Sequence, residues 1–309
     1  STAGASFRSR RSSVTQSSEL TRRWAVAIVG VPVVVGLLYV GSWTLGIPLA
    51  MLAGLGALET YRLAEQRGTR PLRLLGASAA AAIVIEATAF PTFGSFSPWA
   101  LATIGLLALL VAVVSMVTRW PKGHPLVAIS VTVFGALYVG LPLAFVSLLH
   151  SAPEVGAWGP VMADPWTGLA VVALPLASTW IGDAAAFFAG TKWGRSKVLP
   201  RVSPAKSWVG SWTGLLGAAA AGAGWYVSVG SVLPGSPVDG LWTAAALGAA
   251  LGVGAQLGDF IESLLKREAG VKDSGSIFPG HGGVLDRLDA LVITLPLAYT
   301  LLMLLEHYG

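Results

Sequence analysis

Acidic, basic and glycine residues crowd together between two apolar runs near the end of the chain. If the first run is a helix, one face of it carries four polar side chains at i, i+3, i+4 and i+7 spacing, namely Asp259, Glu262, Ser263 and Lys266. Asp286 and Asp289 lie three residues apart at the start of the second run. A few carboxylates together with substrate phosphates suit Mg²⁺, and basic side chains neutralise the remaining phosphate charge. The stretch therefore predicts a phosphate-handling site with a divalent cation, although an ion-paired helix end would have the same pattern.

Glycines in the connection between these two runs would allow the backbone to bind an anion. Gly280, Gly282 and Gly283 can direct backbone N–H groups into one concavity, and the following run begins with a helix N-terminus, which attracts phosphate. His281 lies among these glycines. A simple connection does not need this density of glycine and charge, so we expect this segment to bind substrate.

A second polar stretch contains Ser203, Pro204 and Lys206. A Ser-Pro pair can simply start a helix, as N-cap and first helical residue. Lys206 in the first turn would then oppose the helix dipole, and a bound anion would explain that placement.

Two acidic residues also stand inside apolar runs, where a charge is costly. We interpret Asp183 as a site carboxylate that faces an aqueous cleft, and Glu86 as a protonated or interhelically hydrogen-bonded residue.

The elements that must position these residues are membrane helices. Of 309 residues, 54% are hydrophobic and 11% charged, whereas a soluble domain has about 25% charged residues. The absence of cysteine excludes thiol chemistry and Cys-ligated metals. Long apolar runs predict an all-α integral membrane protein with about nine transmembrane helices. The expected spans are approximately 24–42, 44–60, 75–92, 98–117, 126–149, 168–190, 210–232, 241–264 and 287–306.

All 20 lysine and arginine residues fall in the N-terminal tail or in every second connection between these spans. Positive residues are retained on the cytoplasmic side of a membrane. We therefore expect the N-terminus in the cytoplasm, the C-terminus outside and the polar site on the cytoplasmic face. Topology thus explains the net charge of +5, and no nucleic-acid partner is expected.

Composition divides the chain into three parts. Residues 1–22 are rich in Ser and Arg and poor in apolar residues, so we expect a flexible cytoplasmic tail, although a transit peptide can have the same composition. Residues 23–165 are expected to form N-terminal membrane helices, and residues 166–309 a catalytic membrane region with a cytoplasmic-facing polar site. The many Gly and Ala residues within the spans suit close helix packing, in one chain or in a homodimer.

Residues 263–289 resemble the signature of the phosphatidate cytidylyltransferases, integral membrane enzymes also called CDP-diacylglycerol synthases. Every signature position is filled in a pattern that runs through Lys272-Asp273 and His281-Gly282-Gly283 to Asp286-Arg287-Leu288-Asp289. Residues 203–210 are similar to the family's Ser-Pro-Lys-Lys-Thr-Trp-Glu-Gly element. Ala205 and Val209 depart from that element, so no role is carried over for a carboxylate at 209.

The resemblance implies transfer of the CMP moiety of CTP to phosphatidic acid for phospholipid biosynthesis, giving CDP-diacylglycerol and pyrophosphate, in the inner membrane of a bacterium. It also implies Mg²⁺ held by Asp259 and Asp286, with room for a second cation such as K⁺. The lipid phosphate is already an oxyanion, so positioning and charge neutralisation suffice for catalysis. The implied catalytic residues are Asp259, Asp286, Lys266, Asp289 and Asp183. The implied substrate-binding residues are Ser203, Lys206, Ser263, Arg267, Lys272, Asp273, His281, Gly282, Gly283 and Arg287.

Three other interpretations stay open. A CTP-dependent kinase for polyprenol or phytol would use the same nucleotide but transfer its γ-phosphate to an alcohol. An ion-coupled membrane transporter could use intramembrane carboxylates to carry protons or ions, but it leaves the glycine-rich basic segment unexplained. A structural membrane protein that has lost activity is the third, because Val209 departs from the family pattern.

Overall fold

The computed structural model describes residues 30–154, 156, 164–275, 277 and 282–308, so the predicted tail at 1–22 lies outside the described residues. All regular elements among the described residues are helices, which confirms the all-α prediction for them, and Lys197 and Ser207 form one isolated β-bridge. The helices are α2 (Ser42–Glu65), α3 (Arg73–Ala89), α4 (Phe93–Thr118), α5 (Pro125–Ser151), α6 (Pro165–Trp193), α7 (Trp208–Trp225), the π-helix η1 (Tyr226–Gly230), α8 (Leu241–Ala269), α9 (Leu285–Leu288) and α10 (Leu291–Tyr308).

Each predicted span from residue 44 onward coincides with a helix or a helix pair. Within the described ranges, six helical segments are long and apolar enough to cross a membrane, so the chain is an integral membrane protein. They are α2, α4, α5, α6, α8 and the combined segment Leu285–Tyr308. Two helices that match predicted spans are not among these six. Helix α3 has only 17 residues, and α7 is rich in glycine and alanine. The first predicted span, 24–42, lies partly outside the described residues, and its described part includes the short apolar helix Gly30–Val40.

Helix ends follow from local side chains. Asp164 accepts a hydrogen bond from the backbone N of Trp166 and precedes Pro165, so it caps α6. Thr92 caps α4 through the backbone N of Ser95. These caps satisfy amide groups that have no partner within the helix.

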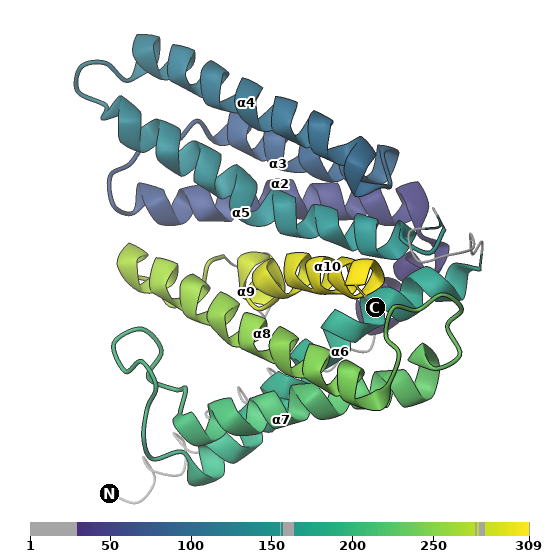
Figure 1. Cartoon of the computed structure of the whole chain (residues 1–309). Coiled ribbons are helices and arrows are strands. Elements are labelled where there is room, and N and C mark those ends of the chain that lie inside the picture. Colours follow the sequence, from purple (N-terminus) through teal and green to yellow (C-terminus); the bar gives the residue numbers. More distant parts are fainter. Residues whose placement is uncertain (1–29, 155, 157–163, 276, 278–281, 309) are drawn as a thin grey trace, which may run out of the picture.

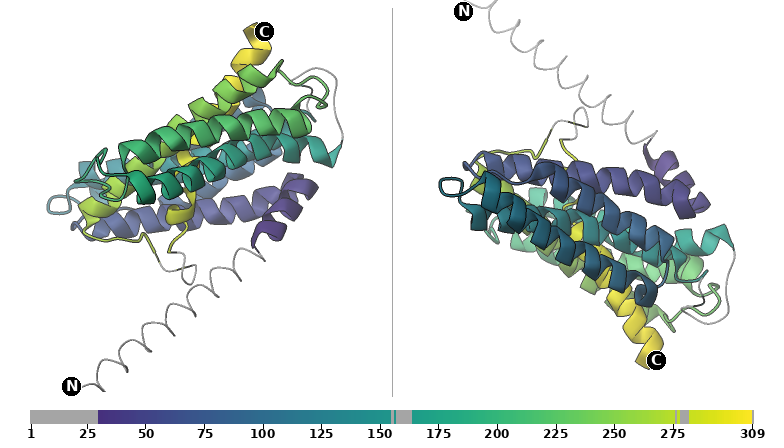
Figure 2. Two further views of the ribbon diagram at one scale, coloured as in Figure 1. Left: turned by 90° about the horizontal axis from the view of Figure 1, so that it is seen from below. Right: turned by 90° about the horizontal axis from the view of Figure 1, so that it is seen from above.

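The helices form two groups with α10 between them (Figure 1). Helices α2, α3, α4 and α5 pack against one another, and α6, α7 and α8 form the second group. Helix α10 contacts α5 from the first group and α6 and α8 from the second. Its C-terminal end extends beyond the neighbouring helices (Figure 2). The two helix groups therefore meet in the region of α8, α9 and α10.

Small residues bring α7 and α8 close together. A Cβ atom at Gly222 would collide with the backbone of Ala244, and one at Gly248 with the backbone of Ala218. Close approach of this kind is the known use of small residues between membrane helices. These two glycines therefore serve helix packing within one chain.

Candidate active site

Helix α8 carries the predicted polar face near its C-terminal end. It continues without interruption to Ala269 and ends at Gly270, whose φ of 77° is a left-handed conformation that favours glycine. The predicted i, i+3, i+4, i+7 arrangement is therefore confirmed. The residues on this face are Asp259, Glu262, Ser263 and Lys266.

Three carboxylates meet beside α8, and we call them the acidic cluster: Asp259, Glu262 and Asp289. One carboxylate oxygen from each lies within 4.8 Å of the others. Glu262 is only 1% exposed, and its Oε1 has no hydrogen-bond partner among the described residues. Like charges this close repel each other unless a cation or protons compensate them. Because carboxylate oxygens are the ligands that Mg²⁺ prefers, the acidic cluster fits a divalent cation.

Asp286 lies outside this cluster and has partners at both oxygens. Its Oδ1 lies 2.8 Å from Nζ of Lys266. Its Oδ2 accepts hydrogen bonds from the backbone N of Ser274 at 2.9 Å, from the Ser274 hydroxyl at 2.9 Å and from the backbone N of Gly283 at 2.8 Å. Asp286 thus ties together the two sides of the connection between α8 and α9, residues 270–284, which we call the Gly-rich loop.

The backbone of the Gly-rich loop is used differently from the prediction. Gly282 has a φ of 79°, which explains the need for glycine there. The amide of Gly283 was expected to face a bound anion, but it donates to the carboxylate of Asp286 instead. Gly280 and His281 lie outside the described residues.

Two lysines join the separate polar stretches. Lys266 Nζ lies 2.8 Å from Glu262 Oε2 and 2.8 Å from Asp286 Oδ1, so it links the acidic cluster to the residue that bonds the Gly-rich loop. Lys206 Nζ lies 2.6 Å from Asp259 Oδ2 and 4.4 Å from the centre of the Phe260 ring. The connection before α7 therefore reaches α8, and the two polar stretches singled out in the sequence meet in space.

The alternative that Ser203 and Pro204 start a helix is wrong. Helix α7 begins at Trp208, and its cap is Ser207, whose hydroxyl accepts from the backbone N of Gly210 at 3.2 Å. Lys206 therefore precedes the helix instead of lying in its first turn. Its ion pair with Asp259 explains its position without a helix dipole.

The remaining predicted site residues differ in their contacts with the acidic cluster and in their exposure to solvent. Ser263 donates its hydroxyl to Asp259 Oδ1 at 3.3 Å. Asp183 on α6 is exposed and interacts electrostatically with Asp259 and Lys206. Ser203 is half-buried, and its backbone N donates to the carbonyl of Leu199. The other exposed members of the predicted set are Arg267, Lys272, Asp273 and Arg287.

Comparison with known proteins decides the family. The model of the cytidylyltransferase family matches residues 21–305. The chain belongs to the cytidylyltransferase family. It is 33% identical over 308 residues to a phosphatidate cytidylyltransferase of Synechocystis sp., covering 92% of this chain and 97% of that protein. It is 32% identical to phosphatidate cytidylyltransferase 4, chloroplastic, of Arabidopsis thaliana, covering 95% and 76%. A Thermotoga maritima phosphatidate cytidylyltransferase is 40% identical over 139 residues, covering 45% and 51%.

Two residues of this cytidylyltransferase near the site were missed from the sequence. Glu59 of α2 is fully buried and contacts the Gly-rich loop. The signal that singled out Glu86, an acidic residue in an apolar run, was equally present at Glu59. Glu86 itself accepts an interhelical hydrogen bond from the hydroxyl of Thr103, which agrees with its interpretation.

The second missed residue is Tyr138 on α5. It is buried, and its hydroxyl has no hydrogen-bond partner among the described residues. It interacts electrostatically with all three carboxylates of the acidic cluster. No sequence pattern singles out a tyrosine within an apolar span, because its relevance depends on how α5 packs beside α8.

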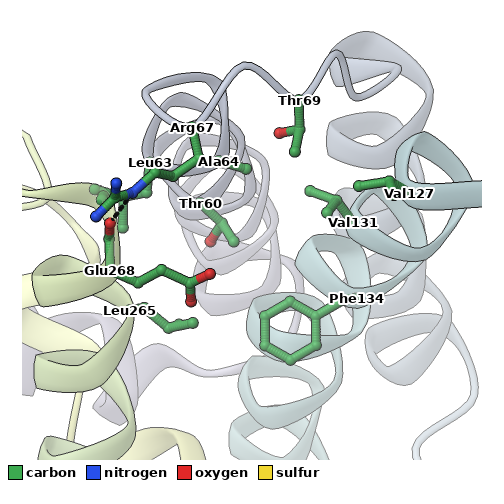
Figure 3. A pocket seen from close by; sticks show the side chains of 11 residues that line it. Thr60, Leu63, Ala64, Arg67, Thr69, Val127, Val131, Phe134, Leu265 and Glu268 are labelled. Carbon is green, nitrogen blue, oxygen red and sulfur yellow. Dashed lines mark hydrogen bonds between the residues drawn. The ribbon is translucent and has the colours of Figure 1, made fainter. Parts of the chain in front are cut away.

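A cavity of about 220 Å³ lies between α2, α5 and α8 (Figure 3). Leu265, Glu268 and Ala269 line it from α8, and Arg67 Nε donates to the carbonyl of Glu268. None of the predicted site residues lines this cavity. The cytidylyltransferase site and the cavity therefore use different faces of α8.

Proposed function

We propose that this chain transfers the CMP moiety of CTP to phosphatidic acid, giving CDP-diacylglycerol and pyrophosphate. The observation that carries the proposal is the meeting of Lys206, Lys266 and the acidic cluster in one place, in a chain that matches its family over residues 21–305. The relatives named phosphatidate cytidylyltransferase support this choice of substrates.

The arrangement of charge suits this reaction. An oxygen of the lipid phosphate attacks the α-phosphorus of CTP, and the bond between that phosphorus and the oxygen bridging to the β-phosphate breaks. Pyrophosphate leaves with the bonding electrons. The attacking oxygen is already negative, so neither a general base nor a protein nucleophile is required, and catalysis depends on positioning and electrostatic stabilisation. Lys206 and Lys266 would neutralise phosphate charge during these steps.

Mg²⁺ is the cofactor that the acidic cluster supports. Glu262 is buried, and one of its oxygens has no partner among the described residues, so this oxygen is available to bind a cation. When bound, the cation would offset the charge of the triphosphate and of the leaving pyrophosphate. Asp259, Glu262 and Asp289 are our favoured ligands, because one oxygen from each lies within 4.8 Å of the others and one oxygen of Glu262 has no partner among the described residues. The sharing of an ion by Asp259 and Asp286 stays a prediction, as does a second cation such as K⁺.

The distribution of basic residues supports a placement in the membrane. Arg62 lies in the last turn of α2, and Lys266 and Arg267 lie in the last turn of α8. The positive-inside rule puts these ends, and with them the acidic cluster, at the cytoplasmic face of a bacterial inner membrane. Nine crossings would then place the N-terminus in the cytoplasm and the C-terminus outside. A homodimer stays a prediction.

A product analysis tests the proposal. The purified protein in phosphatidic acid micelles receives CTP labelled at the α-phosphate, with and without Mg²⁺. We expect the label in a lipid product and release of unlabelled pyrophosphate, both dependent on Mg²⁺. Release of labelled CDP would instead support a lipid kinase. A transporter would take up a substrate into sealed vesicles without chemical change.

A further inference from the structure

A glutamate from the first helix group contacts both ends of the Gly-rich loop. Glu59 lies near the C-terminal end of α2 and is 0% exposed. Its Oε2 accepts hydrogen bonds from the Ser274 hydroxyl and from the backbone N of Leu285, each at 3.0 Å. Ser274 is near the start of the loop, and Leu285 follows its last residue. One carboxylate oxygen thus holds the two ends of this loop together.

The hydroxyl of Ser274 connects Glu59 to Asp286. It lies 3.0 Å from Glu59 Oε2 and 2.9 Å from Asp286 Oδ2. A hydroxyl has one proton to donate, so the two carboxylates share a single donor. Asp286 pairs with Lys266, which in turn pairs with Glu262. A continuous series of polar contacts therefore runs from α2 to the acidic cluster.

The backbone of the Gly-rich loop also fits closely around Glu59. A Cβ atom added at Gly275 or at Gly283 would collide with the Glu59 carboxylate. Glycine at these two positions lets the loop approach the carboxylate, and a larger residue would push it away. The position of the loop is therefore set by shape as well as by hydrogen bonds.

We infer that Glu59 is a positioning residue for the reaction, acting through the Gly-rich loop. This inference rests on the proposed function. Glu59 holds Ser274 and Leu285, these fix Asp286, and Asp286 aligns Lys266 beside the acidic cluster. Loss of the Glu59 carboxylate would release the loop from α2 and so let Asp286 shift relative to Lys266. A misplacement of about 1 Å in an active site can cost about 100-fold in rate.

Two substitutions distinguish the effect of the hydrogen bonds that Glu59 accepts from the effect of its negative charge. Glu59→Ala removes the acceptor of both bonds, so we expect kcat to fall by roughly tenfold to a hundredfold, with a much smaller change in KM for CTP. Glu59→Gln keeps a carbonyl oxygen that can accept both bonds, so we expect it to restore most of kcat. Glu86→Ala is the matched control, because it removes a buried glutamate that bonds another helix but does not touch the loop. Its kcat should equal that of the wild type.

Hydrogen exchange gives a readout that needs no activity. The backbone amide of Leu285 donates to Glu59, so its exchange in the full-length protein should be at least about tenfold faster in Glu59→Ala than in the wild type. Exchange in Glu59→Gln and Glu86→Ala should be unchanged. Wild-type exchange at Leu285 in Glu59→Ala would overturn the inference, and so would a kcat for Glu59→Gln as low as that of Glu59→Ala.

The two proposals fail in distinguishable ways. A wild-type protein that produces no CDP-diacylglycerol would refute the proposed function, while exchange at Leu285 would still decide whether Glu59 holds the loop. Should Glu59→Ala not fold, Ser274→Ala removes the hydroxyl that joins Glu59 to Asp286. We expect that variant to lose about tenfold in kcat, and full activity in it would contradict the inference.

Discussion

Carboxylates occur in two neighbouring places in this molecule, at Asp286 beside the Gly-rich loop and in the acidic cluster, and their surroundings differ. In α9, Asp286 has Lys266 at one oxygen and three donors at the other. In the cluster, Asp259, Glu262 and Asp289 face one another. Lys206 pairs with Asp259 and Lys266 pairs with Glu262, but the other oxygen of Glu262 has no partner in the described part of the chain. Asp286 and Asp289 are only three residues apart, so sequence position does not cause this difference.

The difference suggests a division of roles. A buried polar group that has its hydrogen bonds can hold a fold together, whereas a buried group without them is costly. Like-charged groups that face one another add repulsion to this cost. We therefore assign Asp286 to positioning and the cluster carboxylates, which face one another, to binding a ligand. The predictions below test that assignment.

The largest effect is expected from Glu262→Gln. The substitution keeps the size of the side chain but removes one negative charge from the acidic cluster. We expect kcat to fall by at least about 100-fold, because the cluster loses a charge. The thermal midpoint should change little, because relief of repulsion within the cluster offsets the weakened ion pair with Lys266. Mg²⁺ should raise the thermal midpoint of the wild type by mass action, and this rise should be lost in the variant.

Glu268→Gln is the control for this prediction. Glu268 lies on α8 as well, but on the face that lines the cavity (Figure 3). Its substitution should leave both kcat and the Mg²⁺-dependent rise in thermal midpoint intact. A Glu262→Gln variant that retains the Mg²⁺ effect and full turnover would remove Glu262 from the ligand set.

A smaller loss of turnover, with a clear loss of stability, is expected from Asp286→Ala. The backbone N–H groups of Ser274 and Gly283 lose their acceptor, and each unsatisfied buried donor costs about 1–3 kcal/mol. We expect kcat to fall by roughly tenfold to thirtyfold and the thermal midpoint to fall by about 5 °C. An unchanged midpoint with complete loss of Mg²⁺-dependent turnover would instead support Asp286 as a metal ligand, as predicted from the sequence.

Much of the fold was accessible from the sequence because its main signals are local. Apolar run length located the helices from residue 44 onward, and helical spacing predicted the face that joins Asp259 to Lys266. Lys206 and Asp259 were both assigned to the site through the family resemblance, and the structure joins them in an ion pair. These features depend on composition and period, which a single sequence contains.

The partners of individual carboxylates could not be predicted in this way. Asp286 and Asp289 are identical in type, and the turn at residues 289–290 separates α9 from α10 and gives the two side chains different neighbours. Glu59 meets Leu285 across 226 residues of sequence, and this contact exists only because α2 packs beside α9. Tertiary packing of helices, which no local period encodes, decides which of these carboxylates acquire donors.

A moderate effect is expected from Lys206→Met. The methionine keeps an unbranched apolar side chain but loses the ion pair with Asp259. We expect KM for CTP to rise by about tenfold, because a positive charge beside the acidic cluster is lost, with a smaller change in thermal midpoint. Lys192→Met is the control, since Lys192 is exposed and lies over the ring of Trp193. Equal KM values for the two variants would argue that Lys206 serves only to anchor its loop.

The smallest effect is expected from Tyr138→Phe, and it extends the comparison from carboxylates to hydroxyls. The Tyr138 hydroxyl has no hydrogen-bond partner among the described residues and interacts electrostatically with the acidic cluster. Its removal should leave thermal stability unchanged or higher, because an unsatisfied buried group is lost. If the hydroxyl donates to a ligand of the cluster, KM for CTP should rise about threefold to fivefold.

Tyr61→Phe provides the opposite case. The Tyr61 hydroxyl is buried but donates to the carbonyl of Thr132 at 2.7 Å. Its removal should lower the thermal midpoint by about 2–4 °C and leave KM for CTP unchanged, since the lost bond joins α2 to α5 and does not touch the acidic cluster. A stability loss in Tyr138→Phe equal to that in Tyr61→Phe would show that an unpartnered hydroxyl in this protein does not indicate a ligand site. The assignment of the acidic cluster would then depend on its charge alone.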